Sequence, residues 1–203
     1  LKQRRSLVEK TEVKYNLDLA KTLDEKIDLN YKIPLLELDN KQKFRNNNQL
    51  NNKKIVLFHS GYGGSSDGNL SLEDYVRLAE VVRGLHNIQV VWVFGPDDLG
   101  AKDKISALIS DLDIMYQPPT VMDYCYLIRD SELLISTSTG PMHLAGALNI
   151  KTVSFFGSGL FASSKRWATV NDGDKQLNIE VDMHYQQDFL RKIIDLIIQK
   201  INL

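Results

Sequence analysis

Cysteine is almost absent from this chain, since Cys125 is the single one among 203 residues. One cysteine excludes an intramolecular disulfide and a metal site built from several cysteines, and it suits a reducing compartment. No apolar run approaches the roughly 20 residues that a membrane-spanning helix needs, and no signal peptide is recognisable. Cys125 stands in an apolar stretch with helical character, where we expect it to contribute to packing.

An excess of charge of one sign is also lacking, because 25 basic and 26 acidic residues leave a net charge of −1. The chain therefore has no global field that would attract nucleic acid or an anionic membrane surface, and we expect no nucleic-acid partner. A hydrophobic content of 43% is enough for one well-buried α/β domain with a helical appendage. The chain starts at Leu1 without an initiator methionine, so we expect it to be the later part of a longer protein.

Strand and helix patterns alternate along most of the chain, and no internal repeat is visible. Near-continuous apolar runs are typical of parallel strands covered on both faces, and period-3.6 patterns indicate the helices between them. Five such units predict a doubly wound, Rossmann-like parallel sheet over residues 53–203, with ligands at the carboxyl ends of the strands. Strands are predicted at 55–59, 89–94, 114–117, 132–136 and 152–156, and helices at 71–82, 102–110, 121–129, 141–148 and 186–201.

Residues 1–52 are polar and mixed, and we interpret them as a connecting segment. Apolar residues at helical spacing predict a helix from Lys2 to Leu23, and Pro34–Leu38 is predicted to be extended. Residues 41–54 are rich in Asn, Gln, Lys and Arg, so we predict a solvated linker there.

A phosphate-binding corner is predicted where the strand at 132–136 gives way to the helix at 141–148. Pro141 suits the first helical position, and Gly140 before it allows a sharp turn. The backbone N–H groups of Met142 and His143 would then point out of the positive end of a helix, a natural seat for a diphosphate. A strand-to-helix turn of any function can contain Gly-Pro. The neighbouring loops are therefore needed to tell a phosphate-binding turn from an ordinary one.

Other loops end at the same edge of the predicted sheet. Residues 59–69 include Gly61, Gly63 and Asn69 in a stretch that can bring backbone N–H groups close to a ligand, although an ordinary mobile loop has the same composition. It contains neither G-x-G-x-x-G nor G-K-[ST]. Gly95 and Asp98 follow the second strand, where a carboxylate would meet ribose hydroxyls unless the sequence serves only as a turn. Residues 157–159 and 163–167 complete the edge.

Together these stretches resemble the carboxyl-terminal half of the ADP-heptose:lipopolysaccharide heptosyltransferase family, glycosyltransferases of the two-domain GT-B architecture. The most specific element is the run 138–148, Ser-Thr-Gly-Pro-Met-His-Leu-Ala-Gly-Ala-Leu, similar to the family's Asp/Ser-Thr-Gly-x-x-His-x-Ala-x-Ala-Leu. His59-Ser60-Gly61 stands where the family has His-Pro-Gly, and 152–157 and 165–167 match its Phe-Gly turn and Trp-containing loop. The resemblance covers roughly 55–170, and the segment around Tyr15 also looks like the family's interdomain connector.

The resemblance implies the donor-binding half of an inverting glycosyltransferase, typically moving heptose from ADP-heptose onto the inner core of lipopolysaccharide. Diphosphate contacts are then expected from Ser138, Thr139, Gly140, Pro141, Met142 and His143, with Gly61, Gly63 and Asn69 opposite and Gly95 and Asp98 beside the nucleoside. No metal or other cofactor is required, because amides, the helix dipole and basic side chains can carry the leaving-group charge. The catalytic base and the site for a lipid-linked acceptor belong to an amino-terminal domain, so this chain alone is expected to be inactive. A cytoplasmic protein, peripheral at the inner face of the bacterial inner membrane, is implied.

Two departures from the family pattern leave alternatives open. Where the family usually places a phosphate-binding lysine, this chain has Gly68 or Asn69, and a charge-assisted bond to the leaving group is lost. We hypothesise that Lys165 or Arg166 supplies the charge. Ser138 stands where many members have Asp. The alternatives are a UDP-sugar transferase or epimerase half, or a nucleotide-binding module that has lost the chemistry; His143 has the further alternative of a structural role.

Overall fold

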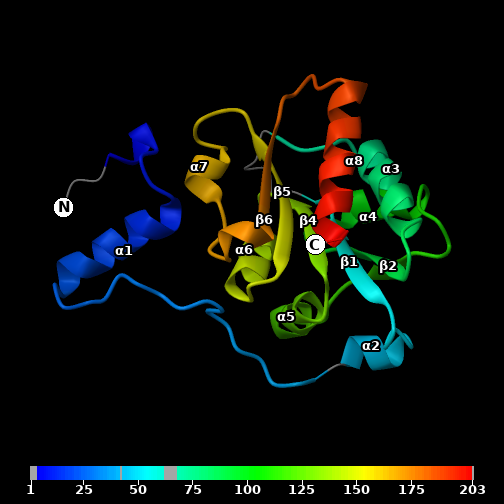
Figure 1. Cartoon of the computed structure of the whole chain (residues 1–203), viewed down its shortest axis with the longest axis horizontal. Coiled ribbons are helices and arrows are strands. Elements are labelled where there is room, and N and C mark those ends of the chain that lie inside the picture. The colour runs from blue at the N-terminus through cyan, green and yellow to red at the C-terminus, as the bar shows by residue number, and fades with distance from the viewer. Residues whose placement is uncertain (1–3, 42, 62–67, 203) are drawn as a thin grey trace.

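The computed structural model of the chain describes residues 4–41, 43–61 and 68–202, and these form a six-stranded parallel sheet of order β3-β2-β1-β4-β5-β6 (Figure 1). This strand order is that of the Rossmann fold, so the predicted fold class is confirmed. The strands are β1 (Lys54–His59), β2 (Ile88–Val93), β3 (Ile114–Tyr116), β4 (Leu133–Thr137), β5 (Lys151–Gly157) and β6 (Gln176–Val181).

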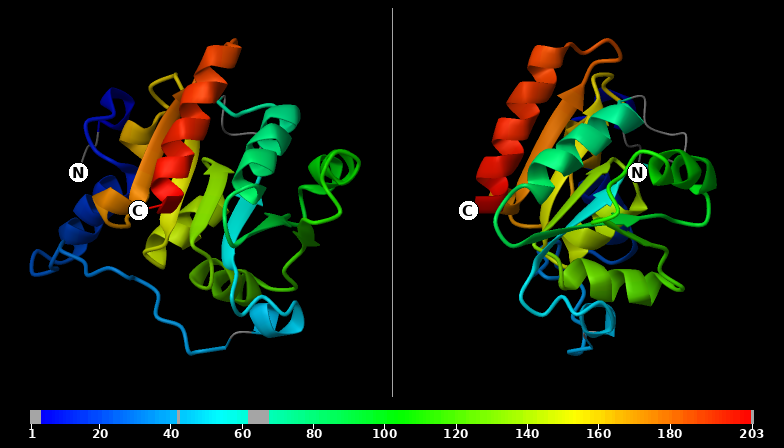
Figure 2. Two further views of the ribbon diagram at one scale, coloured as in Figure 1. Left: turned by 45° about the vertical axis from the view of Figure 1, so that its right-hand side comes forward. Right: turned by 90° about the vertical axis from the view of Figure 1, so that its right-hand side faces the viewer.

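Helices cover both faces of the sheet, as the two views of Figure 2 show. One face carries α3 (Leu72–Arg83), α4 (Leu99–Ser106) and α8 (Gln187–Asn202). The other carries α2 (Lys43–Asn47), α5 (Val121–Arg129) and α6 (Gly140–Ala147). The remaining helical segments of the described residues are η1 (Arg5–Leu7), α1 (Glu12–Leu23), α7 (Ser164–Trp167) and η2 (Gly173–Lys175).

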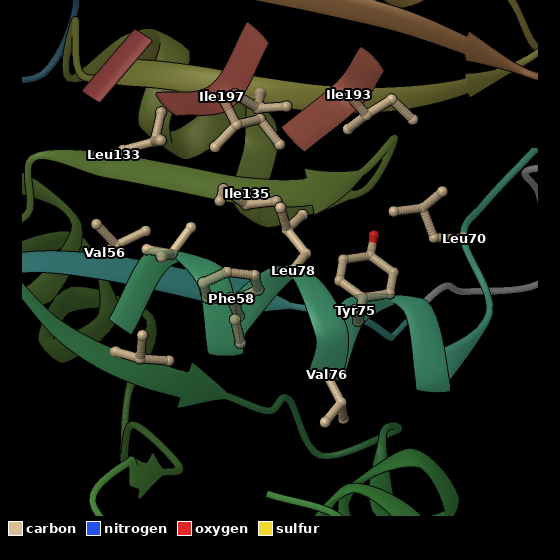
Figure 3. Close-up of a cluster of buried hydrophobic side chains, with 14 of the residues drawn as sticks. Val56, Phe58, Leu70, Tyr75, Val76, Leu78, Leu133, Ile135, Ile193 and Ile197 are labelled. Atoms are coloured by element: carbon tan, nitrogen blue, oxygen red, sulfur yellow. The ribbon is translucent and has the colours of Figure 1, made fainter. Parts of the chain in front are cut away.

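Alternation along each strand divides the buried side chains into two cores. Val56 and Phe58 of β1 face α3 and α8, whereas Ile55 and Leu57 face α5 and α6. Figure 3 shows the first core, in which Tyr75 and Leu78 of α3 and Ile193 and Ile197 of α8 close over β1 and β4. Because both faces are covered, the central strands are the near-continuous apolar runs from which they were predicted.

Side-chain caps fix where two of these helices begin. The Ser71 hydroxyl accepts the Asp74 backbone N–H at 3.1 Å, as the Ser-x-x-Asp pattern predicts, and the Thr120 hydroxyl does the same for Asp123 at the start of α5. Tyr185, just before α8, accepts the Ser71 backbone N–H at 2.9 Å and donates to Asp74 at 2.5 Å. The start of α3 is therefore held from two directions.

The amino-terminal segment differs from its prediction. The helix predicted from Lys2 begins at Glu12, and residues 43–54, predicted as part of a solvated linker, are mostly exposed but include regular structure. They contain α2 and contribute Phe44 and Leu50 to the core beside α5, because two large apolar side chains suffice to anchor an otherwise polar stretch. Further upstream, the backbone N–H groups of Leu35 and Leu36 both donate to the Ala147 carbonyl oxygen at the end of α6, at 2.7 and 3.1 Å.

Three elements near the carboxyl end, α7, η2 and β6, were not predicted. In β6, Leu177, Ile179 and Val181 alternate with polar residues and point to the first core, a half-buried pattern overlooked beside the stronger continuous runs. The short helix α7 lies in the loop after β5, which was predicted only as a basic, Trp-containing loop.

Candidate functional site

The sheet has a topological switch between β1 and β4, because the chain runs outward to β3 on one side and to β6 on the other. Ligands of open parallel sheets bind in the crevice at the carboxyl ends of the strands at such a point. The predicted glycine-rich loop follows β1 here, and the predicted diphosphate corner follows β4. The two meet, since the Thr137 hydroxyl donates to the Gly68 carbonyl oxygen at 3.1 Å.

The amino end of α6 is open on the crevice side. The helix begins at Gly140, one residue before the prediction, with Pro141 second. Thr139 is the N-cap residue, but its hydroxyl donates to the Thr137 carbonyl oxygen at 3.3 Å and makes no cap hydrogen bond. Amides of the first turn have no intrahelical partner. Gly140 is exposed, whereas Met142, one of the two predicted amide donors, is fully buried. A Cβ built on Gly140 has no atom within 4 Å.

Ser138 contributes backbone rather than charge to this corner. Its N–H donates to the Phe155 carbonyl oxygen at 3.0 Å, which extends the pairing of β4 with β5 by one residue. The half-buried serine has no charge, so the helix amides of α6 are the positive groups at this point. The corner is therefore positioned by the sheet itself.

A buried histidine closes the end of β1. His59 Nδ1 donates to the Val93 carbonyl oxygen at 3.1 Å and lies 3.8 Å from Asp98 Oδ2. Burial lowers the pKa of His59 from its ordinary value, and the Asp98 carboxylate and the Val93 carbonyl oppose the shift only in part. His59 is therefore neutral at pH 7.

Asp98, the predicted ribose ligand, turns back toward this histidine. Its Oδ2 accepts the Gly95 backbone N–H at 2.7 Å, and its Oδ1 lies where a Cβ on Gly61 would fall, at 1.9 Å. Gly61 is thus required for the carboxylate to lie where it does. Gly95, Asp98 and Gly61 lie together at the carboxyl ends of β1 and β2, whereas Gly63 lies outside the described residues.

The absence of a lysine at position 68 has a steric explanation. A Cβ on Gly68 would lie 2.3 Å from Gly157 Cα, inside the backbone of β5, so no larger residue fits there. The Asn69 side chain is engaged within the protein: its Oδ1 accepts from the Leu70 N–H and the Tyr75 hydroxyl, at 2.9 and 2.7 Å. Its Nδ2 donates to the Ser60 carbonyl oxygen at 3.3 Å. Asn69 fixes the loop and carries no charge.

A cleft of about 390 Å³ opens between the loop after β1 and the start of α4. This volume lies in the range of small-molecule sites. Gly61, Asn69 and Asp98 of its lining are predicted site residues, whereas Ser60 and Lys104 are not; the place of Ser60 just after β1 and of Lys104 within α4 was the available signal. The lining residues are Ser60, Gly61, Asn69, Leu70, Ser71, Leu72, Asp97, Asp98, Gly100, Ala101 and Lys104.

His143 lies exposed on the first turn of α6, and the Trp167 ring stands edge-on to it with 6.4 Å between centroids. Neighbouring atoms displace part of the water around the imidazole and lower the pKa of His143. A neutral imidazole at pH 7 donates through one ring nitrogen and accepts through the other. Its place beside the open amides is that expected from the sequence.

The two predicted leaving-group cations differ in their surroundings. Lys165 is exposed on α7. The Arg166 side chain is mostly buried: its Nε donates to Glu12 Oε2 at 3.1 Å, and its guanidinium lies 4.9 Å from the Trp167 ring centroid. Glu12 was not among the predicted site residues, and nothing in the sequence links positions 154 residues apart.

Comparison with known proteins identifies the family. Residues 2–190 match the model of glycosyltransferase family 9 (heptosyltransferase). A putative glycosyltransferase of Haemophilus influenzae is 32% identical over 193 residues, and the match covers 87% of this chain and 54% of that protein. The chain spans about half the length of the curated relatives it matches.

Solved structures share the fold. E. coli ADP-heptose LPS heptosyltransferase II superposes with a TM-score of 0.69 at 18% identity, over 87% of this chain and 56% of that one. The E. coli heptosyltransferase WaaC, solved with ADP, gives 0.59 at 11% identity over 74% and 45%. No helix of the described residues has the length and apolar character needed to cross a membrane. The residues matched by the family model cover most of the chain, which therefore belongs to glycosyltransferase family 9.

Proposed function

We propose that this chain is the donor-binding half of an inverting glycosyltransferase that uses ADP-heptose or a similar nucleotide sugar. The observation that carries the proposal is the uncapped amino end of α6, which faces open space at the topological switch point. Membership of family 9 and the shared fold with the ADP-bound WaaC support it. The proposed acceptor is a lipid-linked saccharide of the lipopolysaccharide or lipooligosaccharide inner core, met at the inner face of the membrane.

In the proposed mechanism the diphosphate lies on the first turn of α6. The amide of the exposed Gly140 donates to its oxygens, and the helix dipole stabilises the charge that develops as the glycosidic bond breaks. His143 donates one neutral N–H bond, and the exposed Lys165 adds charge from α7. These groups supply the leaving-group stabilisation without a metal ion.

The nucleoside is proposed to occupy the cleft beside α4. The exposed Asp97 lines it with a carboxylate, which can accept hydrogen bonds from ribose hydroxyls, while the Asp98 carboxylate holds Gly95. Lys104 gives the same wall a cation. The cleft lies beside α4 and the amino end of α6 follows β4, so base and diphosphate would lie on either side of the carboxyl end of β1.

Transfer also requires a carboxylate that deprotonates the acceptor hydroxyl as it attacks. We propose that this base lies in an amino-terminal domain, since the curated relatives are about twice as long as the matched region. The chain of Figure 1 should then bind nucleotide but not transfer sugar.

Calorimetric titration with ADP, UDP and ADP-heptose tests the proposal. We expect ADP and ADP-heptose to bind and Gly140→Leu to abolish binding, because the new side chain extends into the open space beside the amides without a clash. Gly173→Leu in η2 is the matched control, since its Cβ also meets nothing within 4 Å. Preference for UDP would instead indicate the UDP-sugar alternative, and binding of none of the three would refute a donor site in this chain.

A further inference from the structure

Arg166 connects the amino-terminal segment to the edge of the donor site. Glu12, the first residue of α1, accepts from Arg5 through Oε1 at 2.5 Å and from Arg166 through Oε2 at 3.1 Å. The Glu12 and Arg166 side chains are only 15% and 19% exposed, so water screens this pair less than a surface ion pair. Figure 1 shows α1 on the same side of the molecule as α7.

The same guanidinium organises the aromatic side chains next to α6. It lies 4.9 Å from the Trp167 ring centroid and 5.5 Å from that of Phe161, distances typical of cation–π contacts. The Trp167 indole N–H donates to the Phe161 carbonyl oxygen at 2.8 Å, which fixes the ring. Trp167 in turn stands against His143 on the first turn of α6. A continuous series of contacts thus runs from Glu12 to the proposed diphosphate seat.

We propose that Glu12 is a positioning residue for the donor site, which acts through Arg166 and Trp167 on His143. The inference rests on the proposed function and deepens it, because it makes donor affinity depend on where α1 lies. Arg166 therefore serves the site by holding Trp167, while Lys165 is the exposed cation of α7. Linkage requires the reverse effect as well: a bound donor should tighten the contact of α1 with α7.

The chain offers an internal reporter for the test. Trp92 and Trp167 are its two tryptophans, so Trp92→Phe leaves Trp167 alone to report on its surroundings. In this background we expect Glu12→Gln to shift the Trp167 emission maximum and to weaken ADP binding about fivefold, a size typical of coupling between sites. Glu9→Gln is the matched control, since it removes the same charge from an exposed residue of the same segment and should change neither quantity.

A double-mutant cycle separates positioning from general destabilisation. If Glu12 acts through Arg166, then Arg166→Gln weakens ADP binding by itself and Glu12→Gln adds nothing in that background. Equal ADP affinity in Glu12→Gln and Glu9→Gln, or independent effects of Glu12 and Arg166, would overturn the inference alone. If neither the wild type nor the parent Trp92→Phe chain binds any nucleotide, the proposed function is overturned, and the proposed coupling to the donor site falls with it.

Discussion

Replacing Gly68 with alanine would place a methyl group inside the backbone at the end of β5. The new Cβ would lie 2.3 Å from Gly157 Cα and 2.4 Å from both the Gly157 nitrogen and the Phe156 carbonyl oxygen. Backbone atoms of a paired strand, here held by β6 at Phe156 and Gly157, cannot rotate away as a flexible side chain would. Overpacking usually costs 1–3 kcal/mol, and with three backbone atoms in conflict we expect about 3 kcal/mol.

Urea unfolding followed by circular dichroism measures this cost, and for a domain of this size about 3 kcal/mol corresponds to a fall in Tm of roughly 6–12 °C. Gly140→Ala is the control, because its Cβ meets open space and its effect should stay within about 0.5 kcal/mol. A Gly68→Ala chain as stable as Gly140→Ala to within about 1 kcal/mol would show that the loop does not lie between the ends of β4 and β5. The steric account of the missing lysine would then fail too.

Three further predictions concern ionisable groups and a helix cap. The pKa of His59 is depressed in the folded chain, so the stability that this histidine contributes is complete above pH about 6.5 and is lost as the pH falls through the folded-state pKa. The loss is up to about 1.4 kcal/mol per pH unit. His59→Gln should flatten this pH dependence of the free energy of unfolding in urea titrations between pH 7 and 5, and an unchanged slope would contradict the assignment. Because the pKa of His143 is also depressed, its imidazole gains charge only below neutral pH. Affinity for an ADP-sugar should therefore rise severalfold from pH 7 to 5.5 in the wild type but not in His143→Gln. Calorimetric affinities that change with pH in the same way in both proteins would argue against a phosphate contact. Ser71→Ala removes the cap of α3 and should lower the free energy of unfolding by about 1 kcal/mol, measured by urea unfolding; no loss would mean that Tyr185 alone holds this helix start.

Local signals were sufficient for most of the sheet and for the turn that leads from β4 into α6. β1 and β4 could be predicted because they are buried on both faces, and α3 and α6 because a cap or a Gly-Pro turn marks where they begin. The direction of the Asp98 carboxylate could not be predicted, since a turn sequence allows it to face a ligand or, as found, Gly95.

The features that could not be predicted from the sequence depend on contacts between residues far apart in the chain. Phe44 is anchored by Tyr116, whose ring centroid lies 4.7 Å away. In the sequence, the strands β1 and β2 lie between these two residues. The pairing of Glu12 with Arg166 likewise depends on tertiary structure alone. Charged residues in a polar stretch give no sign of a distant partner, so such contacts become visible only when the fold is known.

The hydrogen bonds from Leu35 and Leu36 to the end of α6 bear on how this protein should be shortened for engineering. A minimal nucleotide-binding unit cut at residue 53 would strip both donors from the Ala147 carbonyl and open a hole where Phe44 and Leu50 pack. A cut within the exposed stretch 24–33 keeps both, and removes only α1 and η1. A biosensor built from that shorter unit would retain the fold while losing Glu12, and its nucleotide response would show what α1 adds.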